Sequence, residues 1–166
     1  MTEFVRRLRS RSASATEGLG EVLGSALRPD AVVALDGELG AGKTCFVRGL
    51  ARGLGVTAAV NSPTYTLMHE YPGRLTLYHF DAWMEGREAA LLEDGGDAWF
   101  RAGGVAVVEW AARVASWLPR PYLAVELRHA GPEERVILLR VVGPNAAELE
   151  DLARDLALPE GLEEEP

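Results

Sequence analysis

The segment from Gly37 to Thr44 carries the clearest chemistry in the chain. It reads Gly-Glu-Leu-Gly-Ala-Gly-Lys-Thr and meets every specified position of the Walker A pattern. Its glycines let successive backbone N–H groups converge on an anion, and a following helix adds its positive end. Lys43 would bridge the terminal phosphates of a nucleotide, and Thr44 would offer its hydroxyl to Mg²⁺. The pattern predicts a site for ATP and magnesium formed by Gly37, Glu38, Leu39, Gly40, Ala41, Gly42, Lys43, Thr44 and Cys45.

The basic residues support this prediction. Sixteen of the 17 are arginine, and Lys43 is the only lysine. An ammonium is a compact point charge that fits between two phosphates, where a planar guanidinium is too wide. The plainer alternatives are the chance survival of one lysine and a glycine turn that happens to precede a helix. The apolar run before the loop and the amphipathic segment after it argue against both.

Two carboxylates follow apolar runs that read as strands. Glu109 follows Val105 to Val108, and Asp81 follows Leu77 to Phe80. Nucleotide hydrolysis needs a carboxylate near the metal and a means of orienting water. A carboxylate at a strand end can equally cap the next loop, so the pattern alone leaves both interpretations open.

Other reactive side chains form no further constellation. His79 and Asp81 alternate onto one face of their strand, but a zinc site would need a third ligand at sensible spacing. Cys45, at a helix start, could be an unusually reactive thiol. A small residue packed against the sheet explains Cys45 more simply.

The elements that must position these residues follow from hydrophobic periodicity. Ser14-Ala15-Thr16-Glu17 fits a helix capping box, and Asn145 with Glu148 could cap a last helix. Strands are expected at residues 2–8, 31–35, 64–70, 75–80, 105–108, 122–128 and 135–142, and helices after residues 14, 43, 88, 110 and 145.

Two buried strands, each followed by a helix, favour an α/β fold with a central parallel sheet. The hairpin around Gly131-Pro132 should add antiparallel strands at an edge. We expect a three-layer P-loop NTPase-like domain over residues 1–157 and a disordered acidic tail over residues 158–166.

Charge and composition limit the kinds of partner that the chain can bind. Eight of the 25 acidic residues and one of the 17 basic residues lie from Pro144 onward, so the preceding chain carries a net charge of only −1. Arg6, Arg7, Arg9 and Arg11 make a small basic start. With no surplus of basic residues, we expect no DNA binding, and other chains should hold most of any tRNA. The single cysteine, and the lack of a leader or a membrane-length apolar run, predict a cytoplasmic protein.

With these residues in hand, the chain resembles the bacterial TsaE (YjeE) family, the ATPases of the machinery that makes threonylcarbamoyladenosine beside the tRNA anticodon. The resemblance runs from about Ser12 to Arg140. Its first motif is common to many P-loop proteins, and the other three together are specific to this family. The motifs are Gly37 to Thr44, Ser62-Pro63-Thr64-Tyr65-Thr66-Leu67, Tyr78-His79-Phe80-Asp81 and Val108-Glu109-Trp110.

The resemblance implies a role for each matching position. Thr44 and Glu109 would hold magnesium, and Asp81 would support hydrolysis by orienting water. Thr64 would sense the terminal phosphate, and Trp110 would couple the site to partner contact. The implied partners are the TsaD and TsaB proteins, with tRNA reached indirectly through their complex.

Several positions depart from the family pattern. Trp83-Met84 replaces the usual Tyr-Arg, which would leave the arginine's task to another residue such as Arg87. Ala111-Ala112-Arg113 stands where Pro-Glu-Arg is common.

Three other functions of P-loop proteins are alternatives. A small-molecule P-loop kinase would need clustered arginines in a lid, and residues 84–104 supply only Arg87 and Arg101. A GTPase is disfavoured because the Asn-Lys-x-Asp motif needs a second lysine. A nucleotide-gated binding module, in which hydrolysis is incidental, stays open. The leading hypothesis is an ATPase that is weak alone and depends on its partners, with Lys43, Asp81 and Glu109 as its catalytic residues.

Overall fold

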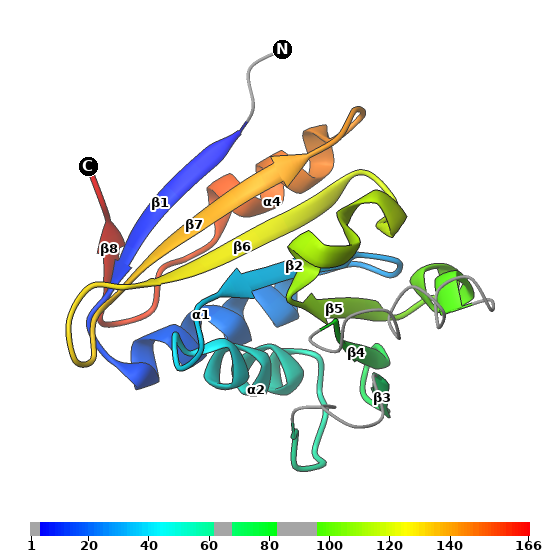
Figure 1. Ribbon diagram of the computed structural model, residues 1–166, viewed down its shortest axis with the longest axis horizontal. Helices are drawn as coiled ribbons and strands as arrows, with labels where there is room; N and C mark the ends of the chain where they lie inside the picture. The colour runs from blue at the N-terminus through cyan, green and yellow to red at the C-terminus, as the bar shows by residue number, and fades with distance from the viewer. Residues whose placement is uncertain (1–3, 62–67, 83–95) are drawn as a thin grey trace.

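The computed structural model describes residues 4–61, 68–82 and 96–166. Within these ranges the strands form one sheet of eight, in the order β3-β4-β5-β2-β6-β7-β1-β8 (Figure 1). The strands are β1 (Val5–Ser10), β2 (Val32–Gly37), β3 (Met68–Tyr71), β4 (Leu77–Asp81), β5 (Val105–Glu109), β6 (Tyr122–His129), β7 (Arg135–Val142) and β8 (Leu162–Glu164). The helices are α1 (Ala13–Ala26), α2 (Lys43–Gly53) and α4 (Ala147–Asp155), with 3-10 helices η1 (Gly96–Arg101) and η2 (Ala111–Trp117).

The middle of the sheet is parallel and its edges are antiparallel. Strands β4, β5, β2 and β6 run parallel to one another. Strand β3 adds an antiparallel strand at one edge, and β7, β1 and β8 add three at the other. The predicted α/β fold is therefore confirmed, with one adjustment. The first strand of the predicted hairpin, β6, belongs to the parallel centre, and the antiparallel edge begins with β7.

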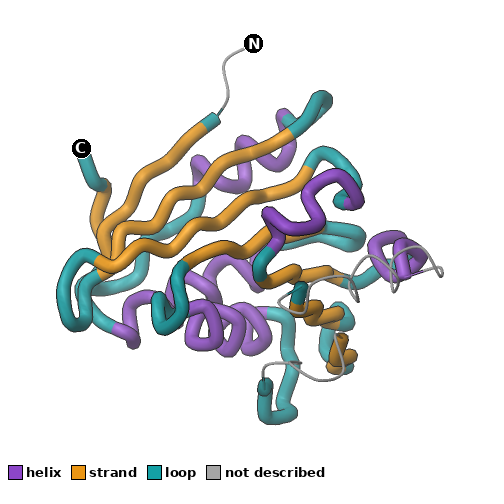
Figure 2. Tube along the Cα trace, viewed as in Figure 1, coloured by secondary structure: helices purple, strands orange, loops and turns teal. Residues whose placement is uncertain are grey.

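Alternation along the strands divides the core into two layers. Val33 and Leu35 of β2 face a cluster that also includes residues of α1, α2 and α4. Val32 and Ala34 face the opposite cluster, which includes residues of η1 and η2. Figure 2 shows helices on both sides of the sheet. The three-layer architecture is thus confirmed, and the second helical layer is made by 3-10 helices.

Helices α1 and α2 pack with their backbones in direct contact. A Cβ placed on Gly20 or Gly24 of α1 would collide with a carbonyl of α2, that of Phe46 or Leu50. The contact is reciprocal, because a Cβ on Gly49 or Gly53 of α2 would collide with a carbonyl of α1. This close approach fixes the position of α2. The first turn of α2 follows the glycine-rich segment from Gly37 to Gly42, called the phosphate loop below.

The predicted helix caps are wrong in detail. Ser12 caps α1, with its hydroxyl accepting a hydrogen bond from the N–H of Ala15, so the helix begins before Ser14. Ala146 precedes α4 and makes no side-chain cap, so Asn145 does not play the predicted role. Asn145 instead has a positive φ of 57°, a conformation that asparagine tolerates in turns.

The prediction that residues 158–166 are disordered is also wrong. Strand β8 pairs antiparallel with β1, placing Leu162 opposite Ser10 and Glu164 opposite Leu8. Leu162 is 9 % exposed and belongs to the core. Three glutamates of this segment bind three arginines of the basic start: Glu164 with Arg6, Glu165 with Arg9 and Glu163 with Arg11. The acidic end and the basic beginning of the chain therefore neutralise each other.

Three predicted elements need further comment. The strand expected over residues 64–70 is observed as β3, and its predicted first residues lie outside the described residues. The helix expected near Glu88 also lies outside them. The helix expected after Trp110 is the 3-10 helix η2. Within the described residues, no helix is long and apolar enough to cross a membrane.

Candidate functional site

The phosphate loop connects β2 to α2, and its backbone is open to an anion. Gly40 and Gly42 have φ values of 78° and 104°, which favour glycine. Gly42 is the N-cap of α2 and offers no side chain to the first turn of the helix. The N–H groups of that turn are therefore free of a side-chain cap and can donate to a bound anion.

Lys43 lies inside this loop. Its side chain is 7 % exposed, and its Nζ donates to the carbonyl of Gly37 and, at 3.2 Å, to that of Glu38. The same Nζ lies 3.9 Å from the ring centroid of Trp110, in cation–π contact. Burial lowers the pKa of Lys43, and the nearby charge of Glu109 opposes this shift. A phosphate bound here would favour the charged ammonium.

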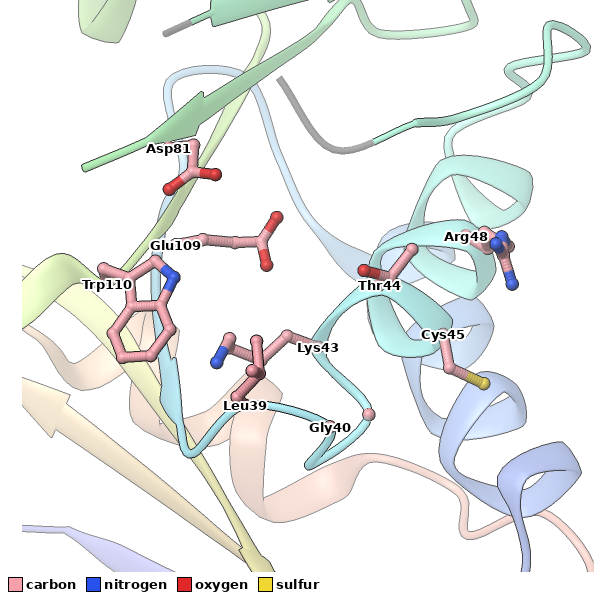
Figure 3. A pocket seen from close by; sticks show the side chains of 10 residues that line it. Leu39, Gly40, Lys43, Thr44, Cys45, Arg48, Asp81, Glu109 and Trp110 are labelled. Atoms are coloured by element: carbon pink, nitrogen blue, oxygen red, sulfur yellow. The ribbon is translucent and has the colours of Figure 1, made fainter. Parts of the chain in front are cut away.

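A cavity of about 500 Å³ opens beside the loop (Figure 3). It brings together residues from α2, from the end of β4 and from the end of β5. Its lining residues are Leu39, Gly40, Gly42, Lys43, Thr44, Cys45, Arg48, Asp81, Glu109 and Trp110. Three of the remaining predicted site residues, Gly37, Glu38 and Ala41, contribute loop backbone and do not line it. Thr64 lies outside the described residues.

Asp81 and Glu109 lie at the C-terminal ends of the neighbouring parallel strands β4 and β5. They are directly opposite each other in the register of β4 and β5, and their exposed fractions are 5 % and 4 %. Figure 3 shows the Glu109 carboxylate between the Lys43 and Thr44 side chains, with Asp81 next to Glu109. Two buried carboxylates from neighbouring parallel strands thus face one lysine and one hydroxyl.

His79 lies behind Glu109. It is fully buried, and its Nε2 lies 2.5 Å from Oε2 of Glu109. His79 is thus a strand histidine that holds the neighbouring Glu109 side chain by a hydrogen bond. Among the described residues there is no group of three or more His, Cys, Asp or Glu side chains able to hold a metal.

The oxygen donors do fit magnesium. Mg²⁺ is commonly bound by one or two carboxylates together with water and substrate phosphates. The Thr44 hydroxyl and the carboxylates of Glu109 and Asp81 are donors of this kind, and all three line the cavity.

Trp110 has an unusual backbone that places its ring over the site. Its φ and ψ are 58° and 37°, in the left-handed region that non-glycine residues rarely adopt. Its N–H donates to the carbonyl of Leu35 at 3.0 Å, which ties this turn to β2. The Arg113 guanidinium carbon also lies over this ring, 5.8 Å from its centroid. The strained turn thus joins the phosphate loop to η2.

Two further groups near the loop have shifted pKa values. Burial raises the pKa of the Cys45 thiol, whose Sγ lies 3.2 Å from the carbonyl of Ala13. A raised pKa lowers the thiolate fraction, which favours packing over special reactivity. Burial also raises the pKa of Asp36, whose Oδ1 accepts the N–H of Ala112.

One lining residue was missed from the sequence. Arg48 follows Thr44 by one helical turn and its side chain is exposed. The spacing of four residues on a helix was the available signal, since it places the two side chains on the same face.

Comparison with known proteins gives a consistent result. The family model described as "Threonylcarbamoyl adenosine biosynthesis protein TsaE" matches residues 10–137. A tRNA threonylcarbamoyladenosine biosynthesis protein TsaE from Treponema pallidum is 46 % identical over 119 residues, covering 72 % of this chain and 88 % of the relative. The protein of the same name from Bacillus subtilis is 41 % identical over 129 residues, covering 77 % and 80 %.

A solved structure is similar over almost the whole chain. The crystal structure of Bacillus subtilis YdiB superposes with a TM-score of 0.78 at 33 % identity, covering 93 % of this chain and 97 % of that one. The likeness therefore extends past the residues matched by the family model.

Proposed function

Because the chain belongs to the TsaE family, which takes part in tRNA threonylcarbamoyladenosine biosynthesis, we propose that it is the magnesium-dependent ATPase of that process. The observation that carries the proposal is the juxtaposition at the phosphate loop. Lys43, Thr44, Asp81 and Glu109 come from three separate segments and line one cavity. This donor set has the complementary charges that a triphosphate and a divalent ion require.

Each residue has a distinct task in this proposal. The N–H groups at the start of α2 donate to the phosphates, and Lys43 exchanges the carbonyls of Gly37 and Glu38 for phosphate oxygens. Thr44 and Glu109 would hold Mg²⁺, whose charge would offset the negative charge on the reacting phosphates. Asp81 accepts a hydrogen bond from the attacking water and orients it toward the terminal phosphate.

The resemblance to the family extends the proposal to partners. TsaD and TsaB would form the complex in which hydrolysis drives the modification cycle, and tRNA would be met through that complex. The paired charges of the two chain ends leave the protein without a strong basic surface of its own from those segments. Slow hydrolysis by the isolated protein is the physical expectation, because P-loop enzymes often receive part of their charge stabilisation from a partner.

One experiment tests the binding and the chemistry separately. Mg-ATP affinity is measured by calorimetry, and phosphate release is measured with and without TsaD, TsaB and tRNA, for wild type, Lys43→Ala and Asp81→Asn. We expect Lys43→Ala to lose affinity and Asp81→Asn to bind ATP but hydrolyse it about 100-fold more slowly. Glu148→Gln is a matched control, because this exposed carboxylate pairs only with Arg28 among the described residues and lies away from the cavity.

Three outcomes would overturn the proposal at different points. A folded wild-type protein with no affinity for Mg-ATP or Mg-ADP would exclude the nucleotide site. An Asp81→Asn variant that binds ATP and supports full tRNA modification over many turnovers would instead favour the nucleotide-gated binding module. A metabolite panel that yields a phosphorylated product would favour a kinase.

A further inference from the structure

The turn between β6 and β7 reaches the phosphate loop. Arg135, the first residue of β7, donates from Nε to the carbonyl of Ala41 at 2.9 Å and from Nη2 to the carbonyl of Gly40 at 3.3 Å. These are consecutive carbonyls in the centre of the loop, 94 and 95 residues earlier in the chain. One guanidinium therefore binds two adjacent peptide groups of the phosphate loop.

This contact orients a loop amide. In a planar trans peptide the C=O and the following N–H point in opposite directions. Drawing the Ala41 carbonyl toward Arg135 turns the N–H of Gly42 away from Arg135, and Gly42 lines the cavity. The positive charge on the guanidinium also polarises the peptide and makes its N–H a stronger donor. The φ of 104° at Gly42 offers no intrinsic restraint, since glycine adopts many backbone conformations.

Arg135 is itself held by its own turn. Its Nη1 donates to the carbonyls of Gly131 at 3.2 Å and Glu134 at 2.8 Å. Both of these contacts are to backbone carbonyls of the turn, so the orientation of the guanidinium depends on the position of the turn. The guanidinium is therefore only as well placed as the turn that carries it.

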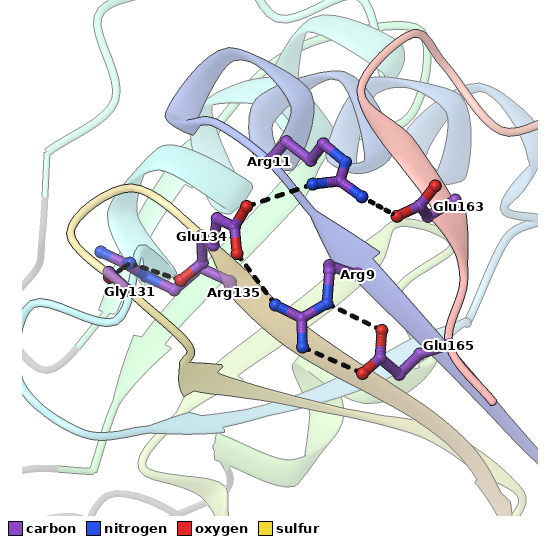
Figure 4. Close-up of polar contacts among 7 residues, drawn as sticks. All are labelled: Arg9, Arg11, Gly131, Glu134, Arg135, Glu163 and Glu165. Carbon is purple, nitrogen blue, oxygen red and sulfur yellow. Dashed lines mark hydrogen bonds and ion pairs between the residues drawn. The ribbon is translucent and has the colours of Figure 1, made fainter.

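The C-terminal strand fixes that turn through the neighbouring residue (Figure 4). The Glu134 carboxylate pairs with Arg9 at 2.9 Å and with Arg11 at 3.3 Å. Arg9 makes a two-point contact with Glu165, at 2.8 and 3.0 Å, and Arg11 pairs with Glu163. A chain of ion pairs thus runs from the end of the protein to the residue beside Arg135.

We propose that Arg135 is a positioning residue for the phosphate loop and that the C-terminal strand β8 supports it through Glu134. The proposal rests on the nucleotide-binding function proposed above. Arg135 does not itself line the cavity, and it acts by fixing the peptides of Gly40 and Ala41. Its removal should weaken nucleotide binding more than it slows the chemical step.

The test compares Arg135→Ala, Arg135→Lys and wild type by Mg-ADP calorimetry and by steady-state hydrolysis. We expect the Kd of Arg135→Ala to rise about tenfold, in proportion to the loss of hydrogen bonds from a charged group, and KM to change more than kcat. Arg135→Lys keeps the charge and should recover part of the affinity. Arg128→Ala is the matched control, because Arg128 is an exposed arginine on the same hairpin that pairs with Glu126.

Hydrogen exchange at the loop gives a second readout that needs no nucleotide. We expect the amides of Gly42 and Lys43 to exchange several-fold faster in Arg135→Lys than in wild type, with the amides of β5 unchanged. This readout also covers the case in which Arg135→Ala does not fold. If wild type binds no nucleotide, the proposed function fails, whereas the exchange measurement still decides whether Arg135 orders the loop.

The contribution of the C-terminal strand is tested by the double variant Glu163→Gln/Glu165→Gln. Its ion pairs are partly exposed, so we expect only about a twofold rise in the Kd for Mg-ADP, disappearing at high salt. Unchanged affinity in this variant would remove β8 from the proposal. Wild-type affinity and wild-type loop exchange in the Arg135 variants would overturn the proposal altogether.

Discussion

Nε2 of His79 lies 2.5 Å from Oε2 of Glu109, and both side chains are buried. The imidazole thus occupies one oxygen of the carboxylate that we propose to hold magnesium and leaves the other available. With Glu109 ionised, Nε2 carries the hydrogen and donates it. Nδ1 has no partner among the described residues, which agrees with an unprotonated nitrogen there, because a buried N–H without an acceptor is costly.

This arrangement predicts a difference between two substitutions of His79. His79→Leu leaves a buried carboxylate without its donor and should lower the free energy of unfolding by about 1–3 kcal/mol. His79→Gln retains an N–H donor of similar reach and should lose less. Urea denaturation measures both. Equal stability of the Leu and Gln variants would mean that the hydrogen bond contributes nothing and that packing alone matters.

The contact between Lys43 and the Trp110 ring predicts an optical signal. Binding of a triphosphate should draw Nζ from its position 3.9 Å from the ring centroid and so change the fluorescence of Trp110. Titration with Mg-ATP should therefore change the intrinsic emission of wild type, and Trp110→Phe should lose most of that change. Trp117→Phe is the control, because Trp117 lies on η2, is 39 % exposed and does not line the cavity. A signal that survives in Trp110→Phe would contradict the prediction.

The backbone contact of the first two helices predicts a large effect from one methyl group. In an exposed helix Gly→Ala would stabilise by about 1 kcal/mol through helix propensity. At Gly49 the new Cβ would collide with the carbonyl of Glu17, so we expect a net destabilisation of about 2 kcal/mol or more. Thermal or urea unfolding of Gly49→Ala measures the change. Arg48→Ala, at the neighbouring exposed position, should stay within about 0.5 kcal/mol of wild type.

The ion pairs made by β8 and by Glu165, the residue that follows it, predict that the stability of the fold depends on pH. The hydrogen-bonded guanidinium of Arg9 lowers the pKa of Glu165 below its ordinary value of 4.5. Because the folded pKa is the lower one, this pair stabilises the fold above pH 4.5, and the contribution is lost as the pH falls through the folded value. The stability difference between wild type and Glu165→Gln, small because the pair is partly exposed, should therefore vanish in acid.

A matched pair of variants isolates that effect from general acid unfolding. Glu160 has no ion pair among the described residues, so Glu160→Gln should match wild type at every pH. The protection factors of the β8 amides, which correct for the pH dependence of intrinsic exchange, should fall in wild type from pH 7 to pH 3 and should already be low at pH 7 in Glu165→Gln. A constant difference between wild type and Glu165→Gln across this range would refute the assignment.

The parts of the site that the sequence could predict are those whose geometry demands particular residue types. A loop that turns its N–H groups onto an anion needs glycines, so Gly37 to Thr44 could be recognised locally. Asp81 and Glu109 could be placed at one sheet edge, because each follows an apolar strand and parallel strands end together. These inferences need only the short-range pattern and the rule that relates strand ends.

The contacts that escaped prediction join distant segments without a local pattern. Nothing around Arg135 indicates that it meets Ala41, and the acidic end looked unstructured because high charge and low hydrophobicity usually mean disorder. The acidic end did carry a signal of its structure, because the arginines of the first strand have the charge that complements the glutamates at the end of the chain. The four-residue spacing of Gly20 and Gly24, repeated at Gly49 and Gly53, likewise indicated close helix packing.

The glycine-lined contact between α1 and α2 restricts the movement of α2. No layer of side chains separates their backbones, so a sliding displacement of α2 along α1 would drive carbonyl groups into carbon atoms. The helix that begins with Lys43 and Thr44 is thus held in a fixed position against α1. If the proposed function holds, adjustments to a change in the bound phosphates would fall on the opposite wall of the cavity, formed by the Trp110 ring and the ends of β4 and β5.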